Sequence, residues 1–468
     1  MIEADFDRPL DAAVVEAKQW LASLGERMVR PDADGTAMLE RFDDELPVKG
    51  EPAEAVVRML AERARPGLMA TGSGRFYGWV MGGAVRAAIA ADWLVSAWDQ
   101  NAGMTEPCPA VCMVEQVAAR WVLQLLGLPP TCSVGFVTGG QMANTVCLAA
   151  ARTHVLGAHD WDVEADGLIG APPISVVVGG ERHSTIDRGL RFLGLGSRSV
   201  RAVEVDDAGR MVPAALKAAL GNLSGPTIVC AQAGNVNGGA VDRLDEIADV
   251  VDRHRTGDIW LHVDGAFGLW ARAEPSRRHL LNGVERADSW ATDAHKWLNV
   301  PYDCGMAICA RPEAHRRAMT VRASYLPAGD EENLRNPLDY NPEFSRRARA
   351  VPVWAALRQL GVDGLAEMVD RCCAMAERFA NSLRGQDGVH VMFQELNQVV
   401  VRFTCAAGRD DDHTREVIRS LQLEGTCFPS ATVWRGFGAM RISVCNWRSD
   451  EADVDRSVRA ILAAHGST

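Results

Sequence analysis

Short β-branched runs alternate with helical segments through the middle of the chain, and this rhythm constrains the fold more than any other feature. Strands are expected at 133–138, 174–180, 199–205, 226–234 and 259–263, with a helix after each of the first four. Repeated strand–helix units build a mostly parallel sheet covered by helices. The rhythm therefore predicts an α/β fold.

The last of these runs, IWLHV, ends in Asp264 and is followed by the small residues Gly265 and Ala266. A short apolar run of this kind is typical of a buried strand that opens into a tight loop. Open α/β sheets bind ligands at the carboxyl ends of their strands. Asp264 is therefore a candidate ligand-binding residue.

A second informative segment, DSWATDAHKWLNVPYDCG, places Lys296 between His295 and Trp297. A poorly hydrated amine of this kind is suited to act as a nucleophile. An acid at a strand end and such a lysine are what a pyridoxal phosphate (PLP) site needs, because the acid keeps the ring nitrogen protonated and the lysine holds the aldehyde. Taken singly, Asp264 could be a turn residue and Lys296 a surface lysine.

HVDGAFG followed by DAHKW resembles the group II PLP-dependent decarboxylases, the family of aromatic amino acid, glutamate and histidine decarboxylases. The resemblance covers most of the chain from about residue 70 onward. It implies fold type I, similar to aspartate aminotransferase, with a mostly parallel central sheet and a smaller C-terminal α+β domain. It also implies PLP as cofactor, an amino acid as substrate, and a homodimer with active sites at the interface.

The same resemblance assigns further cofactor contacts. The helix expected after the strand 133–138 begins at Gly140 and Gln141, and free N–H groups at a helix start bind phosphate. His183, in HSTIDRGLRFLG, matches a family histidine that stacks on the pyridine ring. The remaining implied contacts are Ala266, Asp293 and His295. At GNVNGG the sequence departs from the family, whose members tend to have GTT there, and we expect Asn235 to take over a polar contact in the site.

A long polar segment at 321–349 lacks periodicity, which is typical of functional loops. In the resembling family, a mobile loop here closes over the substrate, and its tyrosine returns a proton to the α-carbon. Tyr340 is the best match and Tyr325 the second, with His295 as a possible relay; a surface tyrosine without a role is the alternative.

The stretch SGRFYGWVMGG, at 73–83, is rich in aromatic residues and glycine. Aromatic residues are most often core residues, but the matching region of the family lines the substrate pocket. We therefore expect Tyr77, Trp79 and Gly82 to contact substrate, and we favour an aromatic or bulky apolar side chain. These stretches contain no basic cluster that could bind a second substrate carboxylate, which disfavours glutamate. Arg441 is expected to have a structural or indirect role.

Composition excludes several other classes. The chain has 49 Lys and Arg against 61 Asp and Glu, which argues against nucleic acid and anionic membranes as partners. The acidic start and the lack of a long apolar run argue against a signal peptide and a membrane span. The twelve cysteines lack zinc-binding spacing, so we expect no metal and a cytoplasmic location.

Three domains are expected: an N-terminal helical arm at 1–72, a PLP-binding domain at 73–345 and a small domain at 346–468. The arm should contain helices at 11–29 and 52–65, separated by a loop at 31–50. The small domain should begin with one long helix or two at 352–384, followed by strands at 389–393, 398–404 and 440–446.

The sequence predicts decarboxylation of an L-amino acid to an amine and carbon dioxide. Two alternatives remain open. One is a different PLP reaction on the same scaffold, such as aldehyde-forming oxidative deamination, transamination or lyase chemistry. The other is a non-catalytic binding protein with this fold.

Overall fold

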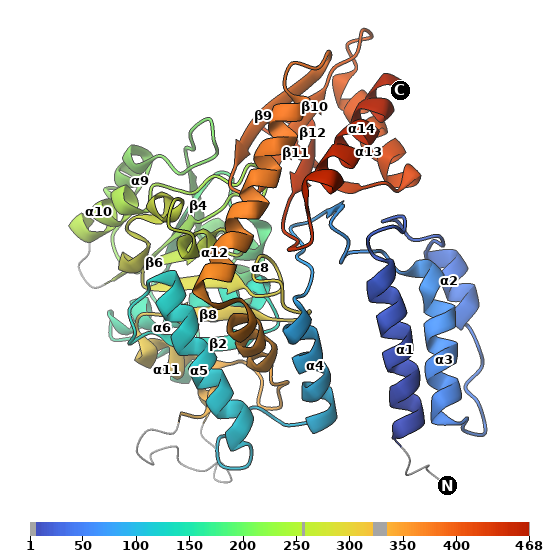
Figure 1. Ribbon diagram of the computed structural model, residues 1–468. Helices are drawn as coiled ribbons and strands as arrows, with labels where there is room; N and C mark the ends of the chain where they lie inside the picture. Colours follow the sequence, from blue (N-terminus) through green and yellow to red (C-terminus); the bar gives the residue numbers. More distant parts are fainter. Residues whose placement is uncertain (1–5, 255–257, 322–334, 468) are drawn as a thin grey trace.

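The structure, a computed structural model, describes residues 6–254, 258–321 and 335–467. Figure 1 shows a helical arm beside two domains, each built on one sheet. The α-helices are α1 (Asp7–Ser23), α2 (Gly35–Phe42), α3 (Ala53–Ala64), α4 (Arg86–Trp98), α5 (Pro109–Leu126), α6 (Gly140–Gly157), α7 (Val163–Asp166), α8 (Ser184–Phe192), α9 (Pro213–Leu220), α10 (Leu244–His254), α11 (Pro312–Met319), α12 (Ala350–Leu383), α13 (Asp410–Glu424) and α14 (Glu451–Ser467). The strands are β1 (Phe76–Tyr77), β2 (Ser133–Val137), β3 (Ser175–Gly179), β4 (Val200–Val203), β5 (Thr227–Gln232), β6 (Ile259–Asp264), β7 (Ser289–Asp293), β8 (Gly305–Cys309), β9 (Val389–Glu395), β10 (Gln398–Phe403), β11 (Phe428–Trp434) and β12 (Phe437–Ser443).

The larger sheet has the strand order β2-β8-β7-β6-β5-β3-β4. Its pairings from β7 through β4 are parallel, and only β8 runs antiparallel to its neighbours in this sheet of described residues. This confirms the expected mostly parallel sheet. The sequence did not reveal β7, because its polar residues Ser289, Thr292 and Asp293 are buried and disguise the strand.

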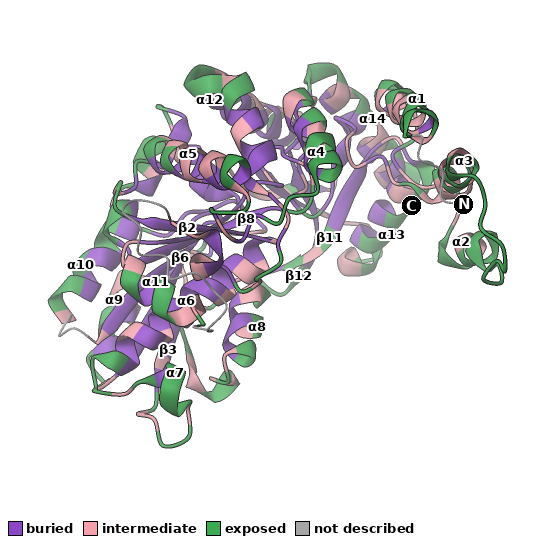
Figure 2. Cartoon of the chain, turned by 90° about the horizontal axis from the view of Figure 1, so that it is seen from below, coloured by how far each residue is buried: buried purple, intermediate pink, exposed green. Residues whose placement is uncertain are grey.

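Strand β6 divides its side chains between the two faces of the sheet. Leu261 and Val263 belong to the larger core, whereas Trp260 belongs to a second core that includes the buried face of α6. Side chains alternate along a strand, so His262 and Asp264 share the α6 face with Trp260. Figure 2 shows the buried strands enclosed by helices whose outer faces are exposed.

The smaller sheet has the order β1-β11-β12-β10-β9. Strand β1 pairs in parallel with β11, so residues 76–77 belong to the small sheet although we expected the large domain to begin at 73. The expected helical segment at 352–384 forms α12. Gly361 has non-helical torsion angles within it, with φ of 64°, so α12 consists of two helices that meet at a kink.

The arm contains α1, α2 and α3. The expected loop at 31–50 was wrong in part, because α2 lies within it. Asp34 caps this helix, and its side chain accepts a hydrogen bond of 2.9 Å from the Ala37 N–H. No helix in the described part of the chain has the length and apolarity required to cross a membrane.

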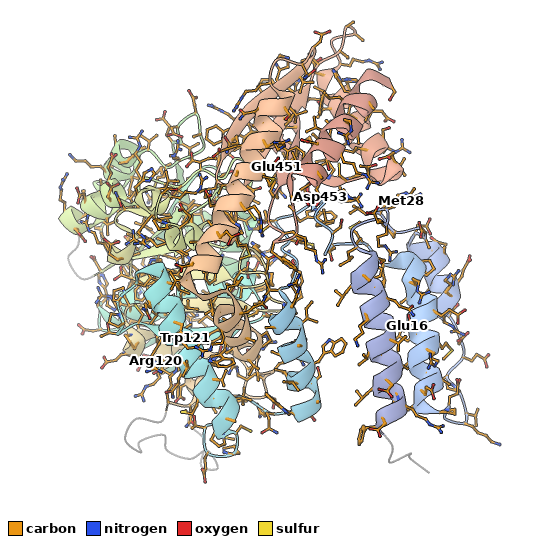
Figure 3. The ribbon with its side chains drawn as sticks, in the orientation of Figure 1. Glu16, Met28, Arg120, Trp121, Glu451 and Asp453 are labelled. Atoms are coloured by element: carbon orange, nitrogen blue, oxygen red, sulfur yellow. The ribbon has the colours of Figure 1, made fainter. Side chains whose placement is uncertain are left out.

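Arg75 joins the arm to the small domain. Its guanidinium donates hydrogen bonds of 2.9 Å to the carbonyls of Gly25 and Arg27, and its Nε lies 3.6 Å from Asp453 Oδ1 in α14. Figure 3 shows Met28 and Asp453 on the two sides of this junction. The arm is thus attached at one end, and its helices extend away from the junction.

Candidate active site

The candidate site lies at the carboxyl edge of the larger sheet. Asp264 ends β6, Asp293 ends β7, and Gly140 opens α6 after β2. His183 caps α8 after β3 and lines one cavity together with Asp264. The fold therefore brings together residues from four separate strand ends.

Asp264 is nearly fully buried, with 5% of its surface exposed. Its Oδ1 accepts a hydrogen bond of 3.2 Å from the Ala266 N–H, and its Oδ2 accepts one of 3.1 Å from Asn144 Nδ2. Hydrogen bonds from such donors favour the charged form of a carboxylate. Ala266 is only half-buried and follows the acid at the open side of the site.

Lys296 has its Nζ 3.1 Å from Asp293 Oδ2, and its side chain is 21% exposed whereas that of Asp293 is 2% exposed. The sequence did not predict this ion pair, because Asp293 was assigned a cofactor contact. The pair balances the Asp293 charge and holds the lysine amine at the end of β7.

His295 lies under the ring of Tyr302, with centroids 4.3 Å apart and the planes inclined by 28°. Its Nδ1 accepts a hydrogen bond of 3.1 Å from the Cys304 N–H, so its proton resides on Nε2, 3.5 Å from Asp293 Oδ1. Burial lowers the pKa of His295, and the Lys296 charge acts in the same direction. We did not predict Tyr302; its aromatic ring in the loop after Lys296 was the available signal.

His183 accepts a hydrogen bond of 3.3 Å at Nδ1 from the Thr185 N–H, and Thr185 Oγ1 lies 2.9 Å from the same nitrogen. Burial lowers the pKa of His183; the charge of Lys296 lowers it further and that of Asp264 opposes this. A neutral imidazole is therefore favoured at neutral pH, which suits a ring-stacking role.

The start of α6 places Gly140 beside Asp293. A Cβ atom on Gly140 would lie 2.6 Å from Asp293 Oδ2, so glycine permits this close packing. The first N–H groups of a helix have no partner within the helix, which makes this end suitable for a phosphate. The side chain of Gln141 donates to the Thr185 carbonyl at 3.2 Å, so its backbone is the better candidate for a phosphate contact.

Gly82 lies against the backbone of Lys296, where any Cβ atom would overlap the lysine carbonyl oxygen. Asn299, which the sequence did not identify, fixes the same turn. Its Nδ2 donates to the carbonyls of Trp297 at 2.8 Å and Cys445 at 2.9 Å. Its Oδ1 accepts from the N–H groups of Gly83 and Trp447 at 3.0 Å each. Gly82 therefore permits close approach to the lysine backbone, and its expected substrate contact stays a prediction.

Two further residues with expected contacts have partners within the protein. Tyr77 is 1% exposed and its ring meets Phe379 edge-on at 5.0 Å, so it packs in the core, and its expected substrate contact stays a prediction. The Asn235 side chain accepts from the Asn237 N–H at 2.8 Å and donates to the Glu181 carbonyl at 3.2 Å. It therefore stabilises its own loop. Trp79 is 52% exposed, and its backbone N–H donates to Ser430 Oγ at 2.9 Å.

Arg441 lies on β12 opposite Ser430 of β11, and 7% of its surface is exposed. After burial, the charge of Arg441 is among the influences that lower the pKa of His183 in the large domain. Burial lowers the pKa of Arg441 itself to about 10. Within the described residues its guanidinium has no anionic partner, and its Nε is buried without a hydrogen bond.

The proposed loop tyrosines lie elsewhere or outside the described residues. Tyr340 ends a short 3-10 helix, Pro337–Tyr340, against β2. The Arg335 guanidinium lies 3.8 Å from its ring centre, and the carbonyl of Tyr340 lies 3.1 Å from His315 Nε2. Tyr325 is outside the described residues. The structure therefore does not bring Tyr340 together with Lys296, and its role stays a prediction.

Comparisons with known proteins give one consistent result. Residues 36–406 match the family model described as the pyridoxal-dependent decarboxylase conserved domain. The 4-hydroxyphenylacetaldehyde synthase of Rhodiola rosea is 27% identical over 95% of this chain and 91% of its own length. The acidic amino acid decarboxylase of Bos taurus is 28% identical over 75% of this chain and 67% of its own length.

A solved structure gives the same picture. The crystal structure of Oryza sativa TDC with PLP and tryptamine has a TM-score of 0.92 at 26% identity, covering 100% of this chain and 99% of that chain. This confirms the expected fold type and cofactor. The donor set fits PLP: a hydrogen-bonded carboxylate for the ring nitrogen, a lysine amine for the aldehyde and a helix start for the phosphate.

Proposed function

Since the chain belongs to the pyridoxal-dependent decarboxylase family, we propose that it converts an aromatic or bulky apolar L-amino acid to its amine and carbon dioxide. In place of the structural role expected from the sequence, we propose that Arg441, a buried guanidinium without an anionic partner in the described residues, contacts the substrate carboxylate on binding and releases it before the bond to the α-carbon breaks. One cation suits one carboxylate, so a second substrate carboxylate has no evident partner among the residues brought together here. Trp79, half-exposed beside the strand that pairs with Arg441, offers an aromatic surface.

When bound, PLP supplies an electron sink for the bond that breaks. Lys296 would hold its aldehyde carbon, Asp264 its ring nitrogen and the start of α6 its phosphate. The carboxylate of Asp264 favours a positive charge on the group that it faces. His183 and Ala266 would pack on the ring faces.

Protons are held by residues around Lys296. His295 keeps a hydrogen at Nε2, because its Nδ1 accepts the Cys304 N–H. Nε2 lies 3.5 Å from Asp293 Oδ1, and the other oxygen of Asp293 lies 3.1 Å from the lysine amine. We assign the proton that returns to the α-carbon to a loop tyrosine, Tyr340 or Tyr325, with His295 as the relay.

The arm supports a homodimer with sites at the interface. A largely apolar groove runs between α1 and α3 and is lined by Ala13, Ala17, Trp20, Val57 and Leu60, among others. Exposed apolar side chains continue on α4, where Trp93, Leu94 and Trp98 are each more than 40% exposed. Apolar surface of this extent is typical of a protein–protein interface. We propose that a second copy of the chain covers it.

Replacing Arg441 with glutamine should weaken amino acid binding by about 10- to 100-fold, as expected for loss of a charged hydrogen bond. The product amine lacks the α-carboxylate, so its inhibition constant should stay unchanged. Steady-state kinetics with and without added amine measures both values. Arg441→Lys keeps the charge, so its amino acid binding should be weaker than that of the wild type and stronger than that of Arg441→Gln. Equal weakening of amine and amino acid would show that Arg441 does not bind the carboxylate.

The reaction itself is tested by mixing PLP-loaded protein with each common amino acid and identifying the products by mass spectrometry. Carbon dioxide with the matching amine supports decarboxylation and names the substrate. An aldehyde or keto acid would move the function to the alternative PLP reaction, as the R. rosea relative's name suggests. Purified protein that takes up no PLP would favour a non-catalytic role.

A further inference from the structure

A hydrogen-bond network of buried polar groups leads from Asp264 into the protein. Asn144 Nδ2 donates to Asp264 Oδ2 at 3.1 Å, and Asn144 Oδ1 lies 2.8 Å from His262 Nε2. His262 Nδ1 lies 2.8 Å from Ser289 Oγ, which accepts a hydrogen bond of 2.8 Å from Trp260 Nε1. All five residues are at least 95% buried.

The proton positions in this network follow from which of its groups can donate and which can accept a hydrogen bond. Asn144 Nδ2 donates to both Asp264 Oδ2 and Thr185 Oγ1, each at 3.1 Å. The opposite amide orientation would place the Asn144 oxygen against a carboxylate, so the oxygen faces His262. His262 Nε2 must then carry a hydrogen, and Ser289 can donate its own hydrogen to Nδ1. Every polar side chain of the network has a hydrogen-bond partner in this arrangement.

The same amide reaches the second proposed contact of the cofactor ring. Thr185 Oγ1, which accepts from Asn144, lies 2.9 Å from Nδ1 of His183. One side chain on α6 thus contacts Asp264 directly and His183 through one hydroxyl. The positions of the Asp264 carboxylate and the His183 ring would therefore both depend on the orientation of the Asn144 amide.

We propose that Asn144 and His262 are positioning residues: His262 fixes the Asn144 amide, and Asn144 holds Asp264 as a carboxylate directed at the cofactor's ring nitrogen. This inference rests on PLP as the cofactor and is independent of the substrate proposed above. An amide donor favours the ionised carboxylate, and an ionised carboxylate favours a proton on the nitrogen that it faces. A purely structural network would instead affect only stability.

The test uses full-length protein loaded with PLP that carries nitrogen-15 in its ring. The nitrogen-15 chemical shift reports whether the ring nitrogen is protonated, and it is followed against pH. The variants are Asn144→Leu, which removes the donor to Asp264, His262→Phe, which removes the donor to Asn144, and His262→Gln, which restores an N–H donor. Thr153→Val is the matched control, since Thr153 has a buried hydroxyl on α6 whose partners, the Ala149 carbonyl and Glu164 Oε1, lie outside this hydrogen-bond network.

In Asn144→Leu the ring nitrogen should lose its proton about one pH unit lower than in the wild type, the size of one hydrogen bond to a charged group. His262→Phe should shift in the same direction, whereas His262→Gln and Thr153→Val should match the wild type. If Asn144→Leu does not retain PLP, the two His262 variants decide the question. Unchanged titration in His262→Phe, or equal shifts in the Phe and Gln variants, would overturn the proposal.

Failure of this proposal is distinguishable from failure of the proposed function. The titration needs no substrate, so an incorrect substrate assignment leaves it unaffected. Wild-type protein without bound PLP would refute the cofactor assignment itself. Thermal unfolding of each variant separates lost stability from a changed ring nitrogen.

Discussion

Replacing Lys296 with alanine is expected to abolish turnover, by at least about 10⁴-fold, because no other amine is placed to hold the cofactor aldehyde in the described site. The variant should still bind PLP at Asp264 and the start of α6, but dialysis with a free amine should remove it. Absorption of the protein before and after dialysis, with product analysis by mass spectrometry, measures both effects.

Lys217→Ala is the matched control, since Lys217 is exposed on α9 and remote from the site. Removing Lys296 also leaves the buried Asp293 without its 3.1 Å ion pair, so unfolding temperatures of both variants are needed. Multiple turnovers by Lys296→Ala would refute the assigned role of the lysine.

The Asp264→Asn variant should lose about 10²- to 10³-fold in kcat, the scale of removing one electrostatic contact from a developing charge. The substitution nearly preserves shape but removes the negative charge that faces the ring nitrogen. PLP should remain attached through Lys296, so its absorption should persist while turnover falls. Steady-state kinetics on protein of known PLP content measures this loss.

Asp288→Asn offers a control of similar environment. Asp288 is 3% exposed and its Oδ2 accepts a hydrogen bond of 2.8 Å from the Leu261 N–H on the same strand, β6, away from the site. It should reduce stability without a large change in kcat. Comparable losses in both variants would mean that Asp264 acts through the fold rather than through its charge.

The sequence predicted the residues that follow strand ends. Asp264, Lys296, His183 and Gly140 converge because parallel strands direct their carboxyl ends to one edge; alternation indicated this for Asp264, and the family resemblance supplied the other three. It could not predict Asn144 or Asn299, whose partners lie far away in the chain and leave no local pattern. The burial of Tyr77 was not predicted either, because an aromatic residue in a glycine-rich stretch is equally typical of a core and of a pocket.

The fold shows a similar division. The long elements with clear periodicity were predicted, including the two-helix alternative for 352–384. The short strand β1 was missed, because two residues carry no period and its pairing with β11 joins distant segments. The strand that carries Arg441 was predicted. That its guanidinium has no anionic partner in the described residues could not be predicted, because this depends on how the two domains pack.

The Asn299 side chain couples the turn that carries Lys296 to the small domain. It bonds Gly83, which precedes α4, and Cys445 and Trp447, which follow β12. The turn therefore has all of these hydrogen bonds only when the small domain is packed against the large one. A displacement of the small domain would act directly on the backbone of Lys296.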